Sequence, residues 1–328
     1  MTARDVLVLG GTAWLGREVV RHLLAAGDRV TCLARGSSAP PPGARLVGTD
    51  RRAADAYTGL GAQEWDEVVE ISYDPVLVSG ALAALADHAR HWTLVSSISV
   101  YAHSTEAGAD ETAALLEPVD LQEYGQAKVA AERASAVALG NRLLVVRPGL
   151  LAGPGDGSDR FGYWVSRFAL ADAGPVLVPA GAERAVQVLD VQDLAVWMVD
   201  AGRRGLTGTF NATGDSHPLT EVLGLAAEVA GFRGRTVEAS DTWLLENDVH
   251  YWAGPRSLPL WLPSSDAGFA RRDTSAFRHA GGAPADLRTT LARALVDERS
   301  RGLARPRRSG LTRREELELL GRLDAPST

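Results

Sequence analysis

Short apolar runs alternate with amphipathic segments along the first half of the chain. Residues 4–9 (RDVLVL) carry apolar side chains on both faces of an extended backbone, which predicts a buried strand. A glycine-rich turn follows at 10–13, and apolar residues then recur at helical spacing over 14–26 until Gly27 ends the helix. The same reasoning predicts five further strands, at 29–34, 44–47, 67–71, 91–96 and 142–146.

Two more helices are predicted between these strands, over 76–88 and 121–139. Strands that are buried on both faces and separated by helices indicate a parallel sheet with helices on both sides, because parallel neighbours need a crossover connection. Right-handed crossovers make this arrangement a doubly wound α/β fold of the Rossmann type.

The pattern changes after Pro148, where the stretch GLLAGPGDGSDRFG is rich in glycine. Five of the eight tryptophans follow it, and they predict a smaller C-terminal lobe that packs over a ligand. We expect 186–190 and 208–211 to return to the main sheet as strands. The predicted domains are a dinucleotide-binding domain over 1–158 with 185–215, and a substrate lobe with C-terminal helices over 159–184 and 216–328.

The turn at residues 10–16 has the sequence GGTAWLG and lies between the first predicted strand and the first predicted helix. Gly10 and Gly16 allow a tight bend and a close approach of backbone to a pyrophosphate, and the helix N-terminus offers free N–H groups to the charge. Ala13 stands where the commoner pattern has a glycine. The strand–turn–helix placement predicts a dinucleotide site.

NADP(H) is the predicted cofactor, with NAD(H) as the alternative. Arg35 follows the second strand, where NAD-binding proteins of this architecture place an acid for the ribose hydroxyls, and a guanidinium there suits a 2′-phosphate instead. The alternative for Arg35 is an ordinary surface position on a loop. Asp50, after the third strand, is predicted to accept from the adenine amino group, to cap the segment that follows, or to do both.

Lys128 is the only lysine in a chain whose lysines and arginines total 34. A position that keeps lysine needs a compact ammonium on a flexible stem, which the planar guanidinium of arginine cannot replace. Tyr124 precedes it by four residues on the same predicted helix, so the two side chains share a face. An ammonium beside a phenol is expected to lower the phenol pKa and make Tyr124 a general acid or base. Ser97, at the end of the fifth strand, is predicted to hydrogen-bond the same substrate oxygen, because ligands bind beyond the carboxyl ends of parallel strands.

Four motifs in this order, GGTAWLG, SSISVY, YGQAK and RPGLLAGPGD, resemble the extended branch of the short-chain dehydrogenase/reductase superfamily, the NAD-dependent epimerase/dehydratases. The resemblance covers residues 4–215 well and the remainder loosely. It implies that Ser97, Tyr124 and Lys128 are the catalytic residues. It also implies dinucleotide contacts from the glycine turn, from three strand ends and from the catalytic helix: Gly10, Thr12, Ala13, Trp14, Leu15, Ser72, Tyr73, Ser96, Tyr124, Lys128, Pro148, Gly149 and Leu150.

We therefore expect an enzyme that interconverts a carbonyl and an alcohol by hydride transfer, with Tyr124 moving the proton, Ser97 orienting the oxygen and Lys128 tuning Tyr124. Ile98 and Ser99 stand where dehydratases of this family carry an Asp-Glu pair, which disfavours dehydration. Two alternatives remain open. One is a sugar or nucleotide-sugar epimerase that uses the same site, and the other is a non-catalytic dinucleotide-sensing or RNA-binding regulator.

The substrate is expected to be a small molecule. Four residues are candidates for the wall of its site, with core packing as the alternative for the last three: Ser99, Tyr101, Trp164 and Arg167. Three arginines could meet an anionic substrate, although in a chain so rich in arginine each has an ordinary surface role as its alternative: Arg160, Arg184 and Arg256.

Composition restricts the partners and the cellular compartment that we expect for this protein. The net charge of −7 argues against general nucleic-acid binding, which needs a basic face, and the basic stretch at 299–317 is predicted to be a solvated linker and helix face, with a polyanion site as its alternative. No apolar run reaches the length of a membrane span and no secretory signal is apparent, so we expect a cytoplasmic protein with no membrane partner. Cys32, the only cysteine, is predicted to be a core residue, and the histidine spacing predicts no metal. Dimerisation of many relatives implies a homodimer.

Overall fold

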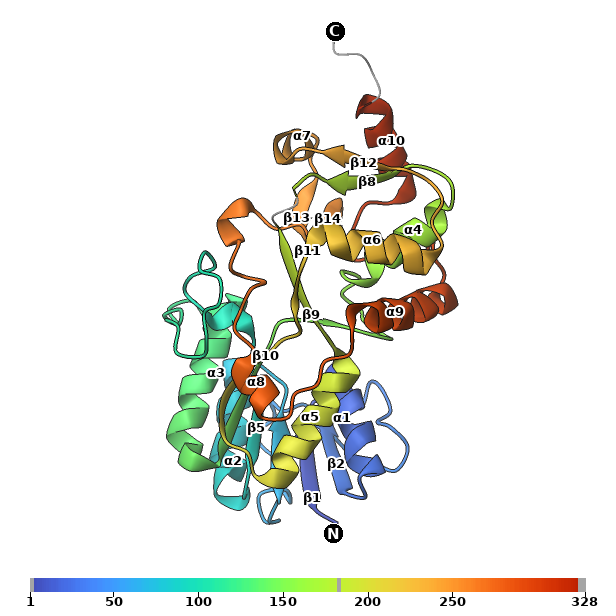
Figure 1. Ribbon diagram of the computed structural model, residues 1–328. Helices are drawn as coiled ribbons and strands as arrows, with labels where there is room; N and C mark the ends of the chain where they lie inside the picture. Colours follow the sequence, from blue (N-terminus) through green and yellow to red (C-terminus); the bar gives the residue numbers. More distant parts are fainter. Residues whose placement is uncertain (1–2, 182–183, 324–328) are drawn as a thin grey trace.

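The computed structural model describes residues 3–181 and 184–323. A seven-stranded parallel sheet forms the lower part of the molecule in Figure 1, with strands in the spatial order β10-β6-β5-β4-β1-β2-β3. The chain builds outward from β1 in one direction and then resumes with β4 on the other side of β1, which creates a switch point where ligands bind. The strands are β1 Asp5–Leu9, β2 Arg29–Ala34, β3 Arg45–Gly48, β4 Glu67–Glu70, β5 Trp92–Val95, β6 Leu143–Pro148 and β10 Gly208–Ala212.

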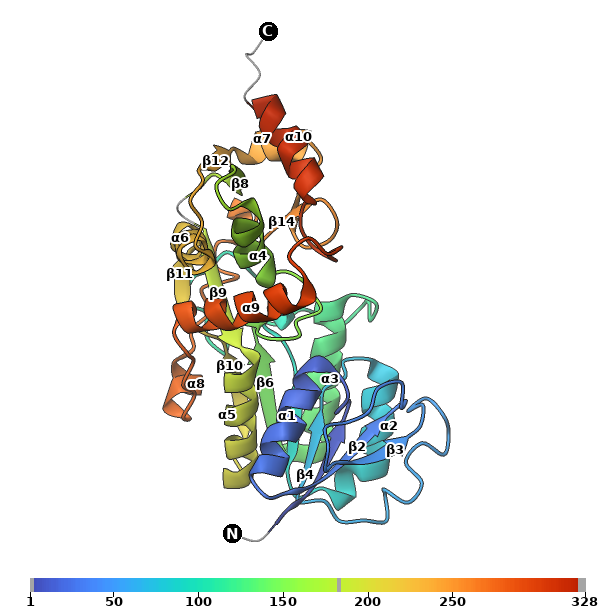
Figure 2. The same cartoon turned by 90° about the vertical axis from the view of Figure 1, so that its right-hand side faces the viewer.

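Helices cover both faces of this sheet (Figures 1 and 2). The strand β1 shows why, since its side chains alternate between the two faces. Val6 and Val8 pack in a cluster with α1 (Trp14–Ala25) and α5 (Val191–Arg204), and the intervening leucines pack on the other face with α2 (Pro75–Leu85) and α3 (Tyr124–Leu139). The predicted doubly wound α/β fold is confirmed.

The start of α3 differs from the prediction, which placed the helix from 121 onward. The helix begins at Tyr124. Asp120 holds the preceding residues in a turn, because its carboxylate accepts from the backbone N–H of Gln122 at 2.9 Å. Such a local side-chain bond competes with helix formation. Tyr124 therefore stands in the first turn of α3.

The prediction that 186–190 returns to the main sheet is wrong. The strand β9 (Ala185–Asp190) is the centre of a separate three-stranded sheet, between β7 (Leu150–Ala152) and β11 (Ser216–Pro218). An apolar run predicts a strand but does not identify its neighbour. The other predicted strand, at 208–211, does join the main sheet as β10 beside β6.

The upper lobe in Figure 1 has its own apolar core. Trp164, Phe168 and Trp261 are fully buried there. Its helices are α4 Gly162–Ala171, α6 Leu219–Ala230, α7 Asp241–Glu246, α9 Leu287–Arg301 and α10 Arg313–Leu323, and its strand pairs are β8 Val176–Pro179 with β12 Thr236–Ala239 and β13 His250–Trp252 with β14 Ser257–Pro259. The short helix α8 (Ser275–His279) packs back against α5 through Phe277 and Trp197, whose ring centroids are 4.9 Å apart. None of the described helices is long and apolar enough to cross a membrane.

The basic stretch at 299–317 is only partly the solvated linker and helix face expected from the sequence, since Arg299, Arg308 and Arg314 are exposed but other arginines are not. Arg305 and Arg307 turn inward and form ion pairs with Glu298 and Asp159, whose side chains are both only 4% exposed. The buried carboxylates supply the counter-charge that a buried guanidinium needs. This stretch therefore fixes the C-terminal segment onto the lobe.

Candidate active site

The glycine turn has a geometry that only glycine permits at two positions. Gly10 has φ of +99°, and its carbonyl oxygen accepts from the N–H of Ala13 at 3.0 Å. A Cβ on Gly16 would lie 2.2 Å from that same carbonyl oxygen, so the first turn of α1 packs directly against the bend. Ala13 is the N-cap residue of α1 and makes no side-chain cap bond. The N–H groups at this helix end therefore remain available to an anion.

A cavity of about 470 Å³ opens at this turn, between the ends of β1, β2 and β4. Its size and its glycine-lined wall fit part of a dinucleotide. Seven of the predicted cofactor residues line it: Gly10, Thr12, Ala13, Arg35, Asp50, Ser72 and Tyr73. Leu15 is different, because its side chain is buried in the core beneath α1 and leaves only its backbone for the turn. Trp14 donates from Nε1 to the carbonyl oxygen of Pro154 at 2.8 Å, which connects the turn to the loop after β7.

Three arginines line this cavity, and they differ in burial and in their partners. Arg35 is exposed, and Arg52 forms an exposed ion pair with Asp74. Arg51 is instead buried in a pair with Glu70, which is itself fully buried at the end of β4. Sequence reasoning missed this pair, although a glutamate that ends an apolar strand was a signal for it. Asp50 accepts from the N–H of Arg52 at 3.0 Å, so it caps the turn that follows, as one of the two predictions for it stated.

The serines after β5 lie at the carboxyl edge of the sheet. Ser97 caps the short 3-10 helix η2 (Ile98–Val100), and its Oγ accepts from the N–H of Ser99 and donates to its Oγ, both at 3.1 Å. The buried hydroxyl of Ser96 has no hydrogen-bond partner among the described residues. Pro148 and Leu150, at the end of β6 and in β7, are buried.

Tyr124 and Lys128 lie on one face of α3, as predicted. Tyr124 is 44% exposed, whereas Lys128 is 2% exposed. The ring of Tyr73 stands edge-on to that of Tyr124, with centroids 4.9 Å apart. The ammonium of Lys128 lies 5.5 Å from the Tyr73 centroid and 5.8 Å from the Tyr124 centroid, and it donates to the carbonyl oxygen of Val95 at 2.5 Å. One ammonium thus lies beside two phenol rings at the end of β5.

The pKa of Tyr124 is raised, not lowered as the neighbouring ammonium leads one to expect. Burial raises it, while the Ser97 hydroxyl and the Arg160 guanidinium act to lower it. The effect of Lys128 on the phenolate stays a prediction, and in this structure its ammonium donates to Val95. Burial in turn lowers the pKa of Lys128 to about 8, against the raising effects of Glu70 and Glu132. The site therefore contains a neutral phenol at neutral pH.

Three of the predicted substrate residues lie in packed interiors, which is a correction. Tyr101 is buried, and its hydroxyl donates to Asn211 at 2.6 Å. Trp164 donates from its indole to the carbonyl oxygen of Pro259 at 2.7 Å within the lobe core. Arg167 pairs with the buried Glu316 at 3.0 Å. All three side chains are at most 4% exposed, so they do not wall a site. The fourth candidate, Ser99, does lie beside Ser97.

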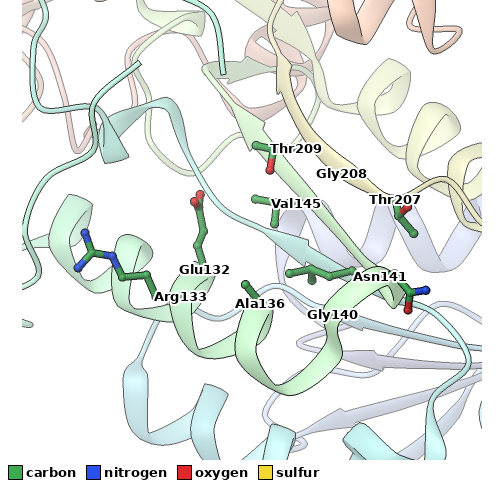
Figure 3. Close-up of a pocket in the computed structure, with 10 residues that line it drawn as sticks. Glu132, Arg133, Ala136, Gly140, Asn141, Val145, Thr207, Gly208 and Thr209 are labelled. Carbon is green, nitrogen blue, oxygen red and sulfur yellow. The ribbon is translucent and has the colours of Figure 1, made fainter. Parts of the chain in front are cut away.

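A second hollow, of about 440 Å³, lies between the C-terminal half of α3 and the edge strand β10 (Figure 3). Its two charged residues are already paired. Glu132 accepts two bonds from Arg147, at 3.0 and 2.7 Å, and Arg133 pairs with Glu117 at 3.0 Å. Neither charged side chain of this hollow is therefore free to bind a ligand. Residues 3–181 and 184–323 contain no cluster of three or more histidine, cysteine or acidic residues that could hold a metal ion.

Comparisons with known proteins find two related reductases. Over 190 residues the chain is 34% identical to a 2′-dehydrokanamycin reductase of Streptomyces kanamyceticus, covering 55% of this chain and 53% of that protein, so about half of that relative is matched. It is 29% identical over 277 residues to a ceramide reductase of Caulobacter vibrioides, covering 77% of this chain and 80% of that one.

Solved structures show the same fold. UDP-glucuronic acid 4-epimerase from Bacillus cereus, in complex with NAD, superposes with a TM-score of 0.67 at 14% identity, over 90% of this chain and 99% of the other. The family profile of NAD dependent epimerase/dehydratases matches residues 6–212. The chain therefore belongs to the NAD dependent epimerase/dehydratase family and is an NAD(P)-dependent enzyme of the oxidoreductase/epimerase type.

Proposed function

We propose that this protein is an NADP(H)-dependent oxidoreductase that interconverts a carbonyl and an alcohol on a small molecule. The observation that carries the proposal is the position of Tyr124, Ser97 and Lys128 around the end of β5, beside a cavity suited to a dinucleotide. The carboxyl edge of an open parallel sheet is where such ligands bind.

Reduction of a carbonyl requires a hydride on carbon and a proton on oxygen. A bound reduced nicotinamide supplies the hydride. Tyr124 supplies the proton, since its raised pKa keeps the phenol protonated until it is used. Ser97 donates to the same carbonyl oxygen after turning its hydroxyl away from Ser99, and Lys128 places positive charge beside the phenolate that remains.

Reduction is favoured over epimerisation because the two curated relatives described above are both reductases. NADP(H) is favoured over NAD(H) because Arg35 and Arg52 both line the cavity beyond β2 and can pair with a 2′-phosphate.

The test of this function is the variant Tyr124→Phe. We expect oxidation of NADPH with a panel of ketones and aldehydes to fall by roughly 10²- to 10⁴-fold, the usual contribution of a positioned general acid. NADPH affinity should stay within about twofold of that of the wild type, since the hydroxyl is not a phosphate contact. Tyr251→Phe is the matched control, because Tyr251 bonds Asp241 in the lobe. Unchanged turnover in Tyr124→Phe would refute the proposal, and inversion of a sugar hydroxyl without net NADPH oxidation would assign the site to an epimerase.

A further inference from the structure

One arginine beside the phenol keeps part of its guanidinium unpaired. Arg160 lies in the loop between β7 and α4, and its Nε donates to the hydroxyl of Ser158 at 3.2 Å. No described residue accepts from its Nη1 or Nη2. The carboxylate of Asp156 accepts from the N–H of Ser158 at 2.7 Å and from its hydroxyl at 2.9 Å, and it forms no ion pair with Arg160. The other two arginines considered for an anion, Arg184 and Arg256, pair with acids: Asp241 and Glu315.

The guanidinium of Arg160 is supported by an aromatic ring. Its carbon lies 5.1 Å from the centre of the Trp252 ring. Trp252 has φ of +68°, a conformation that a bulky side chain rarely adopts and that costs on the order of 1–3 kcal/mol. A backbone bond from its N–H to the carbonyl oxygen of Trp261, at 3.0 Å, helps to hold it there. The strained backbone thus places a flat ring under Arg160, and such strain is typical of functional sites.

The charges around Arg160 also favour an anionic ligand. Burial lowers its pKa, and only Asp156 and Tyr124 act against this effect. Arg160 in turn acts to lower the pKa of Tyr124. A partly buried guanidinium with too little counter-charge favours an anionic ligand.

An apolar wall adjoins this platform. Trp252 meets Phe269 edge-on, with ring centroids 5.6 Å apart, and the two residues line a small cleft together with Ile98 and Leu150. Ile98 directly follows Ser97, so this wall begins next to the residue that contacts the carbonyl oxygen in the proposed reaction.

We propose that Arg160, which lies over the Trp252 ring, binds an anionic group of the substrate, a carboxylate or a phosphate, while the apolar part of the substrate contacts Trp252 and Phe269. The planar fork of the guanidinium can give such a group two parallel N–H bonds. This inference rests on the proposed function, since it defines the class of carbonyl compound that reaches Tyr124. The substrate class is thus an anionic carbonyl or hydroxy compound with an apolar portion.

The test measures binding rather than turnover, so that it is independent of the reductase assay. Enzyme saturated with its tighter-binding dinucleotide is titrated by calorimetry with phenylacetate, phenyl phosphate and the neutral phenylacetamide. We expect at least one anion to bind roughly tenfold or more tightly than the amide, as a charged hydrogen bond provides. Arg160→Gln should abolish this preference and Arg160→Lys should retain part of it.

Two controls define the outcome. Arg314→Gln removes an exposed arginine on α10 and should keep the full preference. Dinucleotide affinity in Arg160→Gln should stay within about twofold of the wild-type value.

The inference is overturned if the wild type binds neither anion at millimolar concentration or prefers neither over the amide. It is equally overturned if Arg160→Gln keeps the preference, or if it weakens dinucleotide binding and so assigns Arg160 to the cofactor. If Arg160→Gln loses the preference for the anion but the wild type reduces no carbonyl compound, only the proposed function is refuted.

Discussion

The ammonium of Lys128 donates to the carbonyl oxygen of Val95, with 2.5 Å between nitrogen and oxygen. This bond fixes the one lysine of the chain at the end of β5. Burial lowers the pKa of Lys128 to about 8, so the ammonium is close to losing its proton under mildly alkaline conditions. The proposed reaction requires the charged form, because it stabilises the phenolate left on Tyr124.

The first prediction concerns pH. Reductase activity should fall as pH rises through about 8, because Lys128 loses its charge there. A pH–rate profile measured from neutral pH upward checks this. Lys128→Met should have little activity and no inflection near that pH. An inflection of equal size in that variant would show that another group titrates.

The same lysine also affects stability. Its pKa of about 8 in the folded protein is below the value of about 10.4 expected in the unfolded chain. The unfolded chain therefore binds more protons between these values, and the free energy of unfolding should gain a contribution from Lys128 as pH rises through this range. Urea denaturation of wild type and Lys128→Met at several pH values measures the difference, which should grow with pH in favour of the wild type.

The second prediction concerns the glycine turn. Gly16→Ala should destabilise the protein and weaken dinucleotide binding, because the new Cβ would lie 2.2 Å from the carbonyl oxygen of Gly10. We expect a loss of about 1–3 kcal/mol in the free energy of unfolding, as for other overpacked positions. Gly224→Ala is the matched control, since Gly224 lies in α6 with open space around its Cβ position. That change should stabilise the helix by up to about 1 kcal/mol. Equal melting temperatures for Gly16→Ala and the wild type would contradict the expectation.

The third prediction concerns cofactor choice. Arg35→Ser should raise the Kd for NADPH by roughly tenfold or more and leave that for NADH nearly unchanged, because only NADPH carries the 2′-phosphate. Fluorescence titration with both dinucleotides measures the two values. Arg45→Ser removes an exposed arginine from β3, outside the cavity, and should change neither. A parallel loss of both affinities in Arg35→Ser would remove the basis for NADP(H) preference.

The fourth prediction concerns the buried pair Glu132–Arg147. Glu132→Leu should cost about 3–5 kcal/mol in the free energy of unfolding, because it leaves a buried guanidinium without its carboxylate. The double variant Glu132→Leu/Arg147→Met should recover part of this loss, because neither charge then remains buried. Denaturant unfolding of the two single variants and the double variant checks both statements. An additive double variant would show that the two side chains do not interact.

The sequence was sufficient to predict the fold and the shared face of Tyr124 and Lys128 on α3. Apolar runs in the first half identified the strands because both faces of this sheet are covered. Lys128 stood out as the only lysine of the chain, and its spacing of four residues from Tyr124 predicted that both lie on one helix face. Composition and local spacing can both be read from a single sequence.

The remaining parts depend on contacts between distant segments. Three residues near the predicted site motifs were misassigned to the substrate wall because each is bound to a residue far along the chain. The pairs are Tyr101 with Asn211, Trp164 with Pro259 and Arg167 with Glu316. The direction of the Lys128 ammonium could not be predicted from the sequence either, because its partner is a backbone carbonyl group, which every residue has. Burial of the Arg51–Glu70 pair also requires the tertiary structure.

The bond from the Trp14 indole to the Pro154 carbonyl oxygen has a mechanical consequence. Trp14 is the first residue of α1, and Pro154 begins the segment that ends in Arg160. The bond therefore joins the end of α1 at the glycine turn to the segment that carries the Arg160 guanidinium. The proposed cofactor and substrate regions thus share one rigid connection, whose removal in Trp14→Phe would disturb both.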